Sequence, residues 1–426
     1  MKRRIKAASI QVRAHDRPMF AAVWPGIRTK MYEAASGGAR LIVLPEGTIP
    51  AYVLGDLSLD EDANRQALAD CKVVASETRT TLVIGAVRRV RSCLVNSASV
   101  IDSDGSVAGW ADKQFLWHFD SQWFSPGDSL RPISTSLGSI GALVCADGRI
   151  PTIAQTLVAR GAQVLVMPTA WVTSGRDPSM LENVQADLLA RVRAQENGVP
   201  FVAANKCGAE IGAVAYCGKS QIIDADGNVL ALASQHDAEI IYADIDVQEP
   251  RETQEAVRLE ASAGDPIAAA RIAVTADAFD ASSLSTTLRI VEADFAIAPD
   301  ATCSANGDRV AIARAGDDTF LDPRGLVDFR RGGGILAVWD AGSRRIERAH
   351  FARARALELR MYVVVIDRPG KRAYAIDPDG TVVCGTFGDF RIAAFVFDPL
   401  KAHATLVAPH TDVLEGLARA AESAKA

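Results

Sequence analysis

The sequence predicts an α/β protein whose main domain is a four-layer α-β-β-α sandwich. Two observations lead to this prediction. Apolar runs typical of buried strands alternate with segments of helical length in some places and follow one another directly in others, so both sheets and covering helices are expected. The 426-residue chain also exceeds what one hydrophobic core normally holds, so we expect two domains.

The first half of the chain supplies these elements in order. A strand near 5–12 precedes a helix over about 18–36, which a Gly-Gly pair ends. The buried strand ARLIVLPE follows, and then a polar-patterned helix over about 60–78. TLVIGAVRRV and LVNSASVID predict paired strands, and an Asp-Gly turn leads to VAGWADK. The apolar strand 140–144 ends at a break, after which Pro151 marks the start of a helix.

Three reactive side chains close strands of this kind. Cys145 ends the strand 140–144 at the start of the next helix, where the helix dipole and free N–H groups favour a thiolate and an oxyanion. Glu46 closes LIVLPE and Lys113 closes VAGWADK. A charged residue that ends a buried strand is costly unless it is paired, so the three endings predict a shared site. The structural alternatives are a core thiol, an exposed strand end and an ordinary hairpin lysine.

These residues resemble the Glu-Lys-Cys triad of the nitrilase superfamily of carbon–nitrogen hydrolases, in the same chain order. The matching segments are LPEGT, ADKQFLW and CADGRIP, and the last fits the family pattern Cys-x-Asp-x-Arg-x-Pro. GAQVLVMPTAW, RAQENGVPFVAANK and GKSQIIDADGNVL resemble later family blocks in the same order. The resemblance covers about residues 5–247 and implies a nitrilase-like catalytic domain over 1–249 with the same four layers.

The resemblance implies a reaction as well as a fold. We expect hydrolysis of a non-peptide C–N bond in a small carboxamide or N-carbamoyl compound, giving an acid and ammonia. Cys145 would form a thioester and Glu46 would act as the base, while Lys113 and the backbone N–H of Ala146 would stabilise the oxyanion. This chemistry needs no cofactor, and no Cys-x-x-Cys pair suggests a metal such as zinc.

The substrate pocket is expected near the loop 114–126, which is rich in aromatic residues and could equally be a surface loop packed on the domain. In many relatives a second glutamate lies where this chain has Asp120, whose shorter carboxylate could hydrogen-bond Lys113 or the substrate. The resemblance places Ala170 and Trp171 at the pocket, although Trp171 could instead be a core residue. We expect His118 to form hydrogen bonds within its loop rather than act as a base.

Four further charged residues have mainly structural interpretations. Asp147 and Arg149 are expected to form an ion pair that holds the turn at Cys145. Arg176 could bind a substrate carboxylate, but a solvated loop arginine is the more common case. Glu196 is expected at a helix end, although carboxylates near the site assist the lysine in some relatives.

The second half of the chain predicts a degenerate repeat. The polar stretch over 250–267 is typical of a linker, and beyond it EADFAIAPDAT, GGGILAVWDA, RARALELRMYVVVID and AIDPDGTVV echo earlier segments in order. Aligning Gly161 with Gly332 places Gly316 where Cys145 stands in the first half. The domain over 268–426 is therefore expected to be non-catalytic, with Asp300 at the glutamate position. Chance similarity between short apolar strands remains the alternative.

Assembly follows from the same resemblance. Family members usually pair as dimers, so we expect the second domain to pack on the first as an intrachain pseudo-dimer, with homo-oligomers of whole chains also open. The tail LEGLARAAESAKA predicts a short amphipathic helix that crosses to a neighbour or frays.

Composition narrows the possible partners and location. A hydrophobic content of 49% with 23% charged residues describes a soluble globular protein, and the net charge of −6 offers no basic surface for nucleic acid. We find no signal-peptide pattern and no apolar run that approaches a membrane span. The seven scattered cysteines are an odd number, which is typical of reduced thiols in a cytoplasmic protein.

Two other functions remain open at this stage. Nitrile hydrolysis is less favoured because nitrilases proper usually have Trp-Glu where this chain has Ala146-Asp147. A non-hydrolytic binding or regulatory protein on the same scaffold is the second alternative, and the intact triad argues against it.

Overall fold

The protein forms two compact units. The structure, a computed structural model, describes residues 3–55, 60–173, 181–247 and 312–425 apart from 343–346, 368, 371 and 387–391, together with the backbone of short strands between 270 and 310. The first unit comprises Met1–Thr253, Ala408–Thr411 and Ala418–Ala426, and the second comprises Gln254–Val407 and Asp412–Leu417. The expected linker 250–267, Arg176 and Asp300 lie outside the described residues.

The first sheet of the first unit has eight strands, in the order β11-β10-β1-β2-β3-β4-β5, with β14 also paired to β1. The central strands β10, β1, β2 and β3 are parallel neighbours, and the others join antiparallel. The bounds are β1 Arg3–Arg13, β2 Leu41–Val43, β3 Thr81–Val90, β4 Cys93–Ile101, β5 Val107–Asp112, β10 Lys206–Glu210, β11 Val214–Cys217 and β14 Glu239–Val247.

The second sheet has six strands in the order β13-β12-β9-β8-β7-β6. The strands β7, β8 and β9 run parallel, and their carboxyl ends lie at one edge. The bounds are β6 Ile133–Thr135, β7 Gly138–Ala142, β8 Val164–Pro168, β9 Phe201–Ala204, β12 Gln221–Ile223 and β13 Val229–Leu232. The two sheets pack face to face, since β1 contacts β9 and β3 contacts β8.

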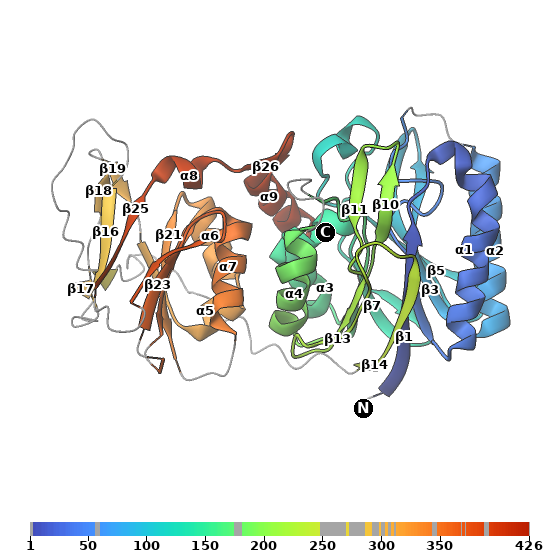
Figure 1. The fold of residues 1–426 in the computed structure, drawn as a ribbon, viewed down its shortest axis with the longest axis horizontal. Coiled ribbons are helices and arrows are strands. Elements are labelled where there is room, and N and C mark those ends of the chain that lie inside the picture. Colours follow the sequence, from blue (N-terminus) through green and yellow to red (C-terminus); the bar gives the residue numbers. More distant parts are fainter. Residues whose placement is uncertain are drawn as a thin grey trace. The chain divides into compact units, whose positions relative to one another are not determined.

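Helices cover both outer faces of this pair of sheets. The helices α1 (Phe20–Ser36) and α2 (Glu61–Thr78) bury their apolar sides on the first sheet, and α3 (Pro151–Ala159) and α4 (Ala190–Asn197) lie on the second. Figure 1 shows the resulting order of helix, sheet, sheet and helix in the first unit. The expected α/β class and four-layer sandwich are confirmed.

The second unit contains a five-stranded sheet in the order β20-β21-β22-β23-β24. This order, the strand directions and a register shift in the last hairpin match those of β7, β8, β9, β12 and β13. The match supports the interpretation of a second copy. The bounds are β20 Ile312–Ala315, α5 Asp317–Leu321, α6 Arg324–Arg331, β21 Leu336–Ala341, α7 Arg348–Leu359, β22 Tyr362–Asp367, β23 Arg372–Ile376 and β24 Val382–Gly385.

The register of this sheet corrects the alignment by one residue. Ile140 pairs with Val164 in the first unit and Ile312 with Leu336 in the second, so both partners are displaced by 172 positions. The turn glycine agrees, because Gly161 has φ +99° and Gly333 has φ +95°. Asp317, rather than the expected Gly316, therefore corresponds to Cys145.

A buried arginine with similar partners also occurs on one helix of each unit. Arg193 on α4 donates from Nε to the carbonyl of Gly148 at 3.0 Å, and Arg355 on α7 donates to the carbonyl of Phe320 at 2.9 Å. Each arginine also forms a buried ion pair with the glutamate three residues later, Arg193 with Glu196 and Arg355 with Glu358. Glu196 is thus a structural residue, as expected.

The remaining described elements connect or extend these sheets. The strand β16 pairs with β25, and β15, β17, β18 and β19 form two short ribbons. The bounds are β15 Ala270–Arg271, β16 Thr286–Val291, β17 Ala298–Pro299, β18 Cys303–Ala305, β19 Asp308–Val310, β25 Ile392–Phe397, α8 Pro399–His403, β26 Leu406–Ala408, β27 Thr411–Asp412 and α9 Val413–Ser423. None of the described helices has the length and apolar composition of a membrane span.

The C-terminal segment differs from expectation. Sequence reasoning assigned all of 268–426 to the second domain, but 408–411 and 418–426 belong to the first unit. The helix α9 is amphipathic as expected, and it buries Leu417 and Ala420. Its last residues, 418–423, group with this chain's own first unit.

Candidate active site

Glu46 lies in the turn that follows β2, where β3 approaches very closely. A Cβ atom at Gly85 would stand 2.4 Å from the Cα of Glu46, so only glycine permits this backbone contact. Gly85 also donates its N–H to the carbonyl of Pro45 at 3.1 Å. The close approach fixes Glu46 between the two sheets, and its side chain is fully buried.

Two donors share one oxygen of the Glu46 carboxylate. Lys113 Nζ and Asn96 Nδ2 each donate to Oε1 at 2.7 Å. The other oxygen, Oε2, is buried without a hydrogen-bond partner among the described residues. Burial raises the pKa of Glu46, Lys113 opposes this effect, and the charge of Asp120 adds to it, so that the pKa lies above its usual value.

Lys113 bridges Glu46 to Asp120. Its Nζ lies 2.6 Å from Asp120 Oδ2, and both side chains are fully buried. The Tyr52 hydroxyl donates to the other oxygen of Asp120 at 2.9 Å, and the Tyr52 ring faces Lys113 Nζ at 5.7 Å. Burial lowers the pKa of Lys113, but Asp120 and Glu46 outweigh it and hold this pKa well above its ordinary value. The Asp120 carboxylate therefore contacts Lys113, one of the two roles expected for it.

Cys145 begins a short 3-10 turn, Cys145–Arg149, that separates β7 from α3. Its backbone has φ +47°, a left-handed conformation that is unfavourable for a side chain with a Cβ atom. The thiol is nearly buried, with 5% of the residue exposed. Burial and then Glu46 raise the pKa of Cys145, whereas Lys113 and the neighbouring Thr169 and Ala170 lower it. A raised pKa favours the neutral thiol, which needs a base before it can act as a nucleophile.

The expected ion pair between Asp147 and Arg149 is absent from the described residues. Asp147 instead accepts three backbone N–H groups, from Gln114 at 2.9 Å, Phe115 at 2.8 Å and Val144 at 3.0 Å. Burial raises the pKa of Asp147 to about 7 against these hydrogen bonds. The carboxylate joins the Cys145 turn to the segment after Lys113, so backbone donors satisfy it in place of a guanidinium.

The guanidinium of Arg149 lies over the ring of Trp117, 4.3 Å from its centroid. It has no hydrogen bond or ion pair among the described residues, and its Nε is buried. Burial lowers the pKa of Arg149 to about 10, while the nearby Cys145 raises it. A cation beside the thiol therefore lacks an anionic partner in this part of the chain.

A second buried ion pair, from β10, holds the turn after Glu46. Lys206 Nζ lies 2.5 Å from Glu210 Oε1 and donates to the carbonyl of Gly47 at 3.0 Å. Glu210 accepts the backbone N–H of Val53 at 2.7 Å and, less closely, that of Tyr52 at 3.5 Å. The pair thus fixes both ends of the segment between the Glu46 and Tyr52 side chains.

Comparison with known proteins gives this arrangement a family. The profile of the Carbon-nitrogen hydrolase family matches residues 6–255, more than half of the chain. The chain belongs to the carbon–nitrogen hydrolase family. The citrullinase of Francisella tularensis subsp. tularensis is 27% identical to it over 265 residues, which are 58% of this chain and 90% of that protein. Omega-amidase NIT2 of Homo sapiens is 30% identical over 239 residues, 53% of this chain and 83% of that protein.

Solved structures agree on the fold of this carbon–nitrogen hydrolase. A carbon-nitrogen hydrolase from Helicobacter pylori G27 has a TM-score of 0.51 and 26% identity, and covers 57% of this chain and 89% of that chain. An amidase from Nesterenkonia sp. has the same TM-score at 24% identity, with 56% and 89% covered, which shows the fold alone. Apart from residues 254 and 255, the second unit lies outside the matched family residues.

The backbone of Trp171 is held on both sides in this carbon–nitrogen hydrolase. Its N–H donates to Asn205 Oδ1 at 2.8 Å and its carbonyl accepts Cys217 N–H at 3.0 Å. Its side chain is fully buried, and the indole N–H has no hydrogen-bond partner among the described residues. Trp171 therefore presents a fixed, unpaired donor.

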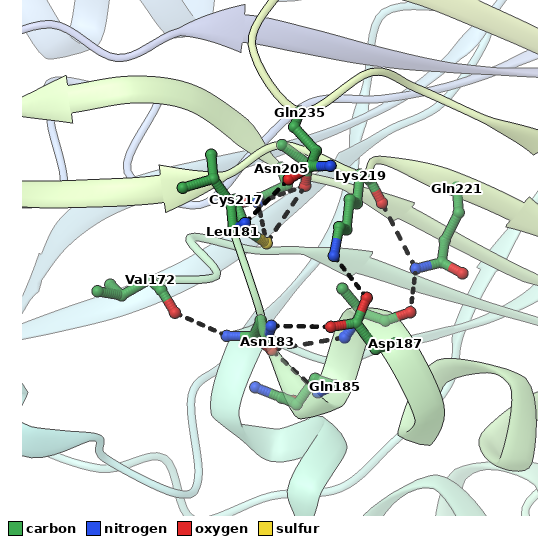
Figure 2. Close-up of polar contacts among 12 residues, drawn as sticks. Val172, Leu181, Asn183, Gln185, Asp187, Asn205, Cys217, Lys219, Gln221 and Gln235 are labelled. Atoms are coloured by element: carbon green, nitrogen blue, oxygen red, sulfur yellow. Dashed lines mark hydrogen bonds and ion pairs between the residues drawn. The ribbon is translucent and has the colours of Figure 1, made fainter. Parts of the chain in front are cut away.

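Polar side chains also hold the backbone of the residues that follow Trp171. Figure 2 shows Asn183 donating to the carbonyl of Val172 at 2.9 Å, and Asp187 accepting from Asn183 N–H at 3.0 Å and Lys219 Nζ at 2.7 Å. Asn205 also donates to the carbonyl of Gly218 at 2.7 Å. These contacts tie the chain after β8 to the start of α4 and to the strand β12.

The structure thus brings Glu46, Lys113, Cys145 and Asp120 together, with Ala146 and Ala170 next to the thiol in the chain or by hydrogen bond. Sequence reasoning missed Tyr52, Asn96 and the pair Lys206–Glu210. Asn96 follows an apolar residue in the strand LVNSASVID, and a polar residue inside such a strand was the available signal. His118 has φ +50° and bonds through its backbone N–H, which agrees with a loop role.

Proposed function

We propose that this protein hydrolyses the C–N bond of a small carboxamide or N-carbamoyl compound through a cysteine thioester, releasing ammonia and an acid. The observation that supports it best is the buried contact of Lys113 with both Glu46 and Asp120 beside the Cys145 thiol. Relatives named for citrulline and for omega-amides support this substrate class.

Acylation follows from the positions of the three groups. The free oxygen of Glu46 takes the proton of the Cys145 thiol as the sulfur attacks the amide carbon. The oxyanion that forms is stabilised by the Lys113 ammonium and by the N–H of Ala146, which lies in the first turn of the 3-10 segment, where backbone N–H groups have no partner within the helix. Glu46 then returns the proton to the leaving nitrogen, so that ammonia departs and a thioester remains.

Deacylation uses the same base. A water molecule that enters after ammonia leaves gives a proton to Glu46 and attacks the thioester carbon. The second tetrahedral intermediate collapses with the sulfur as leaving group, which recovers the proton from Glu46. The acid is released and the Cys145 thiol is restored. Every step uses side chains of this chain, so the reaction requires no cofactor.

Two features would define the rest of the substrate. The family resemblance places Ala170 and Trp171 at the pocket, and the indole N–H of Trp171 has no hydrogen-bond partner among the described residues. The unpaired guanidinium of Arg149 favours a substrate that carries a carboxylate, since a buried cation gains most from an anionic partner. Omega-amides of dicarboxylic acids and N-carbamoyl amino acids both have such a group.

The test is ammonia release from a panel of neutral amides, omega-amides, N-carbamoyl amino acids and nitriles, with the Cys145→Ala protein as the blank. We expect a signal that depends on Cys145 and is strongest for carboxylate-bearing amides. In Arg149→Met, KM for those amides should rise at least about tenfold, with little change for neutral amides.

Any of three results would overturn the proposal. Equal ammonia release by the Cys145→Ala protein would remove the thioester mechanism. Silence across the panel, together with no alkylation of Cys145 by iodoacetamide, would favour a binding protein. A signal confined to nitriles would replace amide hydrolysis by nitrile hydrolysis.

A further inference from the structure

The C-terminal segment lies in the catalytic unit although the family match ends at residue 255. Residues 408–411 and 418–426 group with the first unit, and the C-terminal end of α9 is marked in Figure 1. Arg160, which follows α3, donates from Nη2 to the carbonyl of Ala424 at 2.7 Å. The chain thus leaves the catalytic unit and returns to it some 150 residues later along the sequence.

One returning residue binds the loop that carries Asp120. The backbone N–H of His118 donates to Thr411 Oγ1 at 2.6 Å, and Thr411 is almost completely buried. His118 has a left-handed backbone, φ +50°, which is unfavourable for a residue with a Cβ atom unless its surroundings hold it. Asp120 follows two residues later and binds Lys113. The Thr411 hydroxyl therefore holds a strained point next to this carboxylate.

A second returning residue binds the loop at its other end. Ser423 Oγ donates to Gln114 Oε1 at 2.9 Å, and both side chains are buried. Gln114 directly follows Lys113, and its backbone N–H donates to Asp147 Oδ1 at 2.9 Å. Its side-chain amide also donates to the carbonyls of Asp112 and Ser129. Ser423 thus completes the hydrogen bonding of the residue next to the catalytic lysine.

We propose that Thr411 and Ser423 are positioning residues for the reaction: they fix the two ends of the segment 114–118 and so hold Lys113 and Asp120 in register with Glu46 and Cys145. The inference rests on the proposed amide hydrolysis. It assigns a role in the active site to a part of the chain outside the matched family residues. A displacement of about 1 Å at a catalytic group can cost about a hundredfold in rate, so such support has a measurable effect.

The test uses Thr411→Val and Ser423→Ala, which remove one hydroxyl each and keep the shape of the site. Thr29→Val and Ser76→Ala are matched controls, because their hydroxyls bond to carbonyls within the exposed helices α1 and α2. We expect kcat to fall about tenfold in each site variant and further in the double variant, with KM within about twofold. Thr411→Ser should restore kcat to within about twofold of wild type.

A second readout does not need turnover. Hydrogen exchange of the backbone amides in 114–124 should become at least about tenfold faster in both site variants and unchanged in both controls. The rate at which iodoacetamide alkylates Cys145 should change as well, because Lys113 sets the electrostatic environment of this thiol.

The outcomes separate the two proposals. Normal exchange in 114–124 for both site variants would overturn the positioning role, whether or not the protein is an amidase. Faster exchange with unchanged kcat, or the same fall in kcat in the controls, would also overturn it. A wild-type protein that is silent on the substrate panel but shows the expected exchange pattern would contradict the proposed function and leave the support of the loop standing.

Discussion

Lys113 lies between the carboxylates of Glu46 and Asp120, where little water screens their charges. One cation facing two anions keeps its proton over the whole neutral range, in line with the strongly raised pKa of Lys113. In the proposed reaction, Glu46 is the base that gains and loses a proton. The pH dependence of catalysis should therefore report Glu46.

The first prediction concerns the acid limb of the pH profile, where activity rises as Glu46 becomes ionised. Glu46 is active as a base only when ionised, and its pKa is raised by burial and by the charge of Asp120. Asp120→Asn removes that charge, so the pKa of Glu46 falls and the acid limb of kcat/KM moves to lower pH. We also expect the plateau to fall about tenfold or more, because Lys113 loses a charged partner. A pH profile of kcat/KM measures both effects.

Asp128→Asn is the matched control, because Asp128 is an exposed carboxylate in the same loop region. Its profile should follow the wild type. An acid limb that moves to higher pH in Asp120→Asn, or does not move, would contradict the coupling between the two carboxylates.

The second prediction concerns Asp147, which joins the Cys145 turn to the segment after Lys113. An amide in its place keeps one acceptor oxygen but turns an N–H donor toward one of the three backbone N–H groups. We expect Asp147→Asn to lower the free energy of unfolding by about 1–3 kcal/mol, the cost of an unsatisfied buried donor. Urea denaturation monitored by fluorescence measures the change. A loss no larger than that of Asp128→Asn would show that these hydrogen bonds contribute little.

At the scale of elements, residues of the strand β10 hold the turn that carries Glu46, the proposed base. Lys206 and Glu210 are four residues apart in the chain and lie at the two ends of this strand. Together they bind Gly47 just after Glu46 and Val53 just after Tyr52. A single ion pair thus fixes the base and the phenol that bonds Asp120.

The third prediction follows from the burial of that pair. Glu210→Gln leaves the Lys206 ammonium buried without its counter-charge, so we expect the free energy of unfolding to fall by about 3–5 kcal/mol. Replacing both residues, in Lys206→Met with Glu210→Leu, should recover much of this stability. The double variant should nevertheless remain slow, because the N–H groups of Tyr52 and Val53 lose their acceptor.

The control is Glu61→Gln, which breaks the exposed ion pair between Glu61 and Arg89. Exposed pairs contribute about 1 kcal/mol or less, so this change should be small in thermal and urea unfolding. A double variant with wild-type kcat would show that the pair stabilises the fold without placing the base.

Sequence reasoning succeeded where the signal was local. The three strand endings at Glu46, Lys113 and Cys145 were recognisable because a charged or nucleophilic residue follows an apolar run in each case. Asp120 was found through the family resemblance, because many relatives have a second glutamate at its position. The pair Lys206–Glu210 was not found, because its partners lie about 160 positions away along the chain and meet only through the pairing of β10 with β1.

Register limited the reasoning about the second unit in the same way. Apolar strands resemble one another, so a shift of one residue changes little in a comparison of letters, and consecutive glycines at 332–334 allow either alignment. The backbone φ of Gly333 and the pairing of β20 with β21 decide it. An amphipathic pattern likewise predicts that α9 buries one face but not what it packs against.

At the scale of the whole molecule, the two units share a sheet topology, but the described part of the second unit has no cysteine at the position that matches Cys145. Asp317 stands where Cys145 does, and it accepts hydrogen bonds from Trp339 Nε1 and from Gly342 N–H, both at 3.0 Å. These hydrogen bonds give the Asp317 carboxylate a structural role. That the second unit is a degenerate copy of the family domain remains our interpretation, and so does the cytoplasmic location suggested by the cysteines.

The fourth prediction tests the division of roles. Asp317→Ala should lower the free energy of unfolding by about 1–3 kcal/mol, since the Trp339 indole N–H and the Gly342 N–H lose their acceptor. The kcat of the folded protein should remain within about twofold of wild type, whereas Cys145→Ala should abolish turnover. A loss of activity in Asp317→Ala without loss of folding would give the second unit a part in the chemistry.

The fifth prediction concerns assembly. We propose that the second unit packs on the first within one chain, as an internal substitute for a second subunit. Cross-linking of dilute protein, followed by mass spectrometry of the species with the mass of one chain, should give links between residues 3–247 and residues 312–407. Links of this kind found only in species of twice that mass would favour pairing between chains.

The left-handed backbone at Cys145 lowers the stability of the fold in favour of the proposed function. Cys145, the proposed nucleophile, holds a conformation that glycine adopts freely, so a glycine at this position would remove backbone strain. Asp317, at the matching place in the second unit, begins a helix and has no positive φ. Natural variants that lose the thiol can therefore keep a stable fold. A well-folded, abundant relative of this chain need not have catalytic activity.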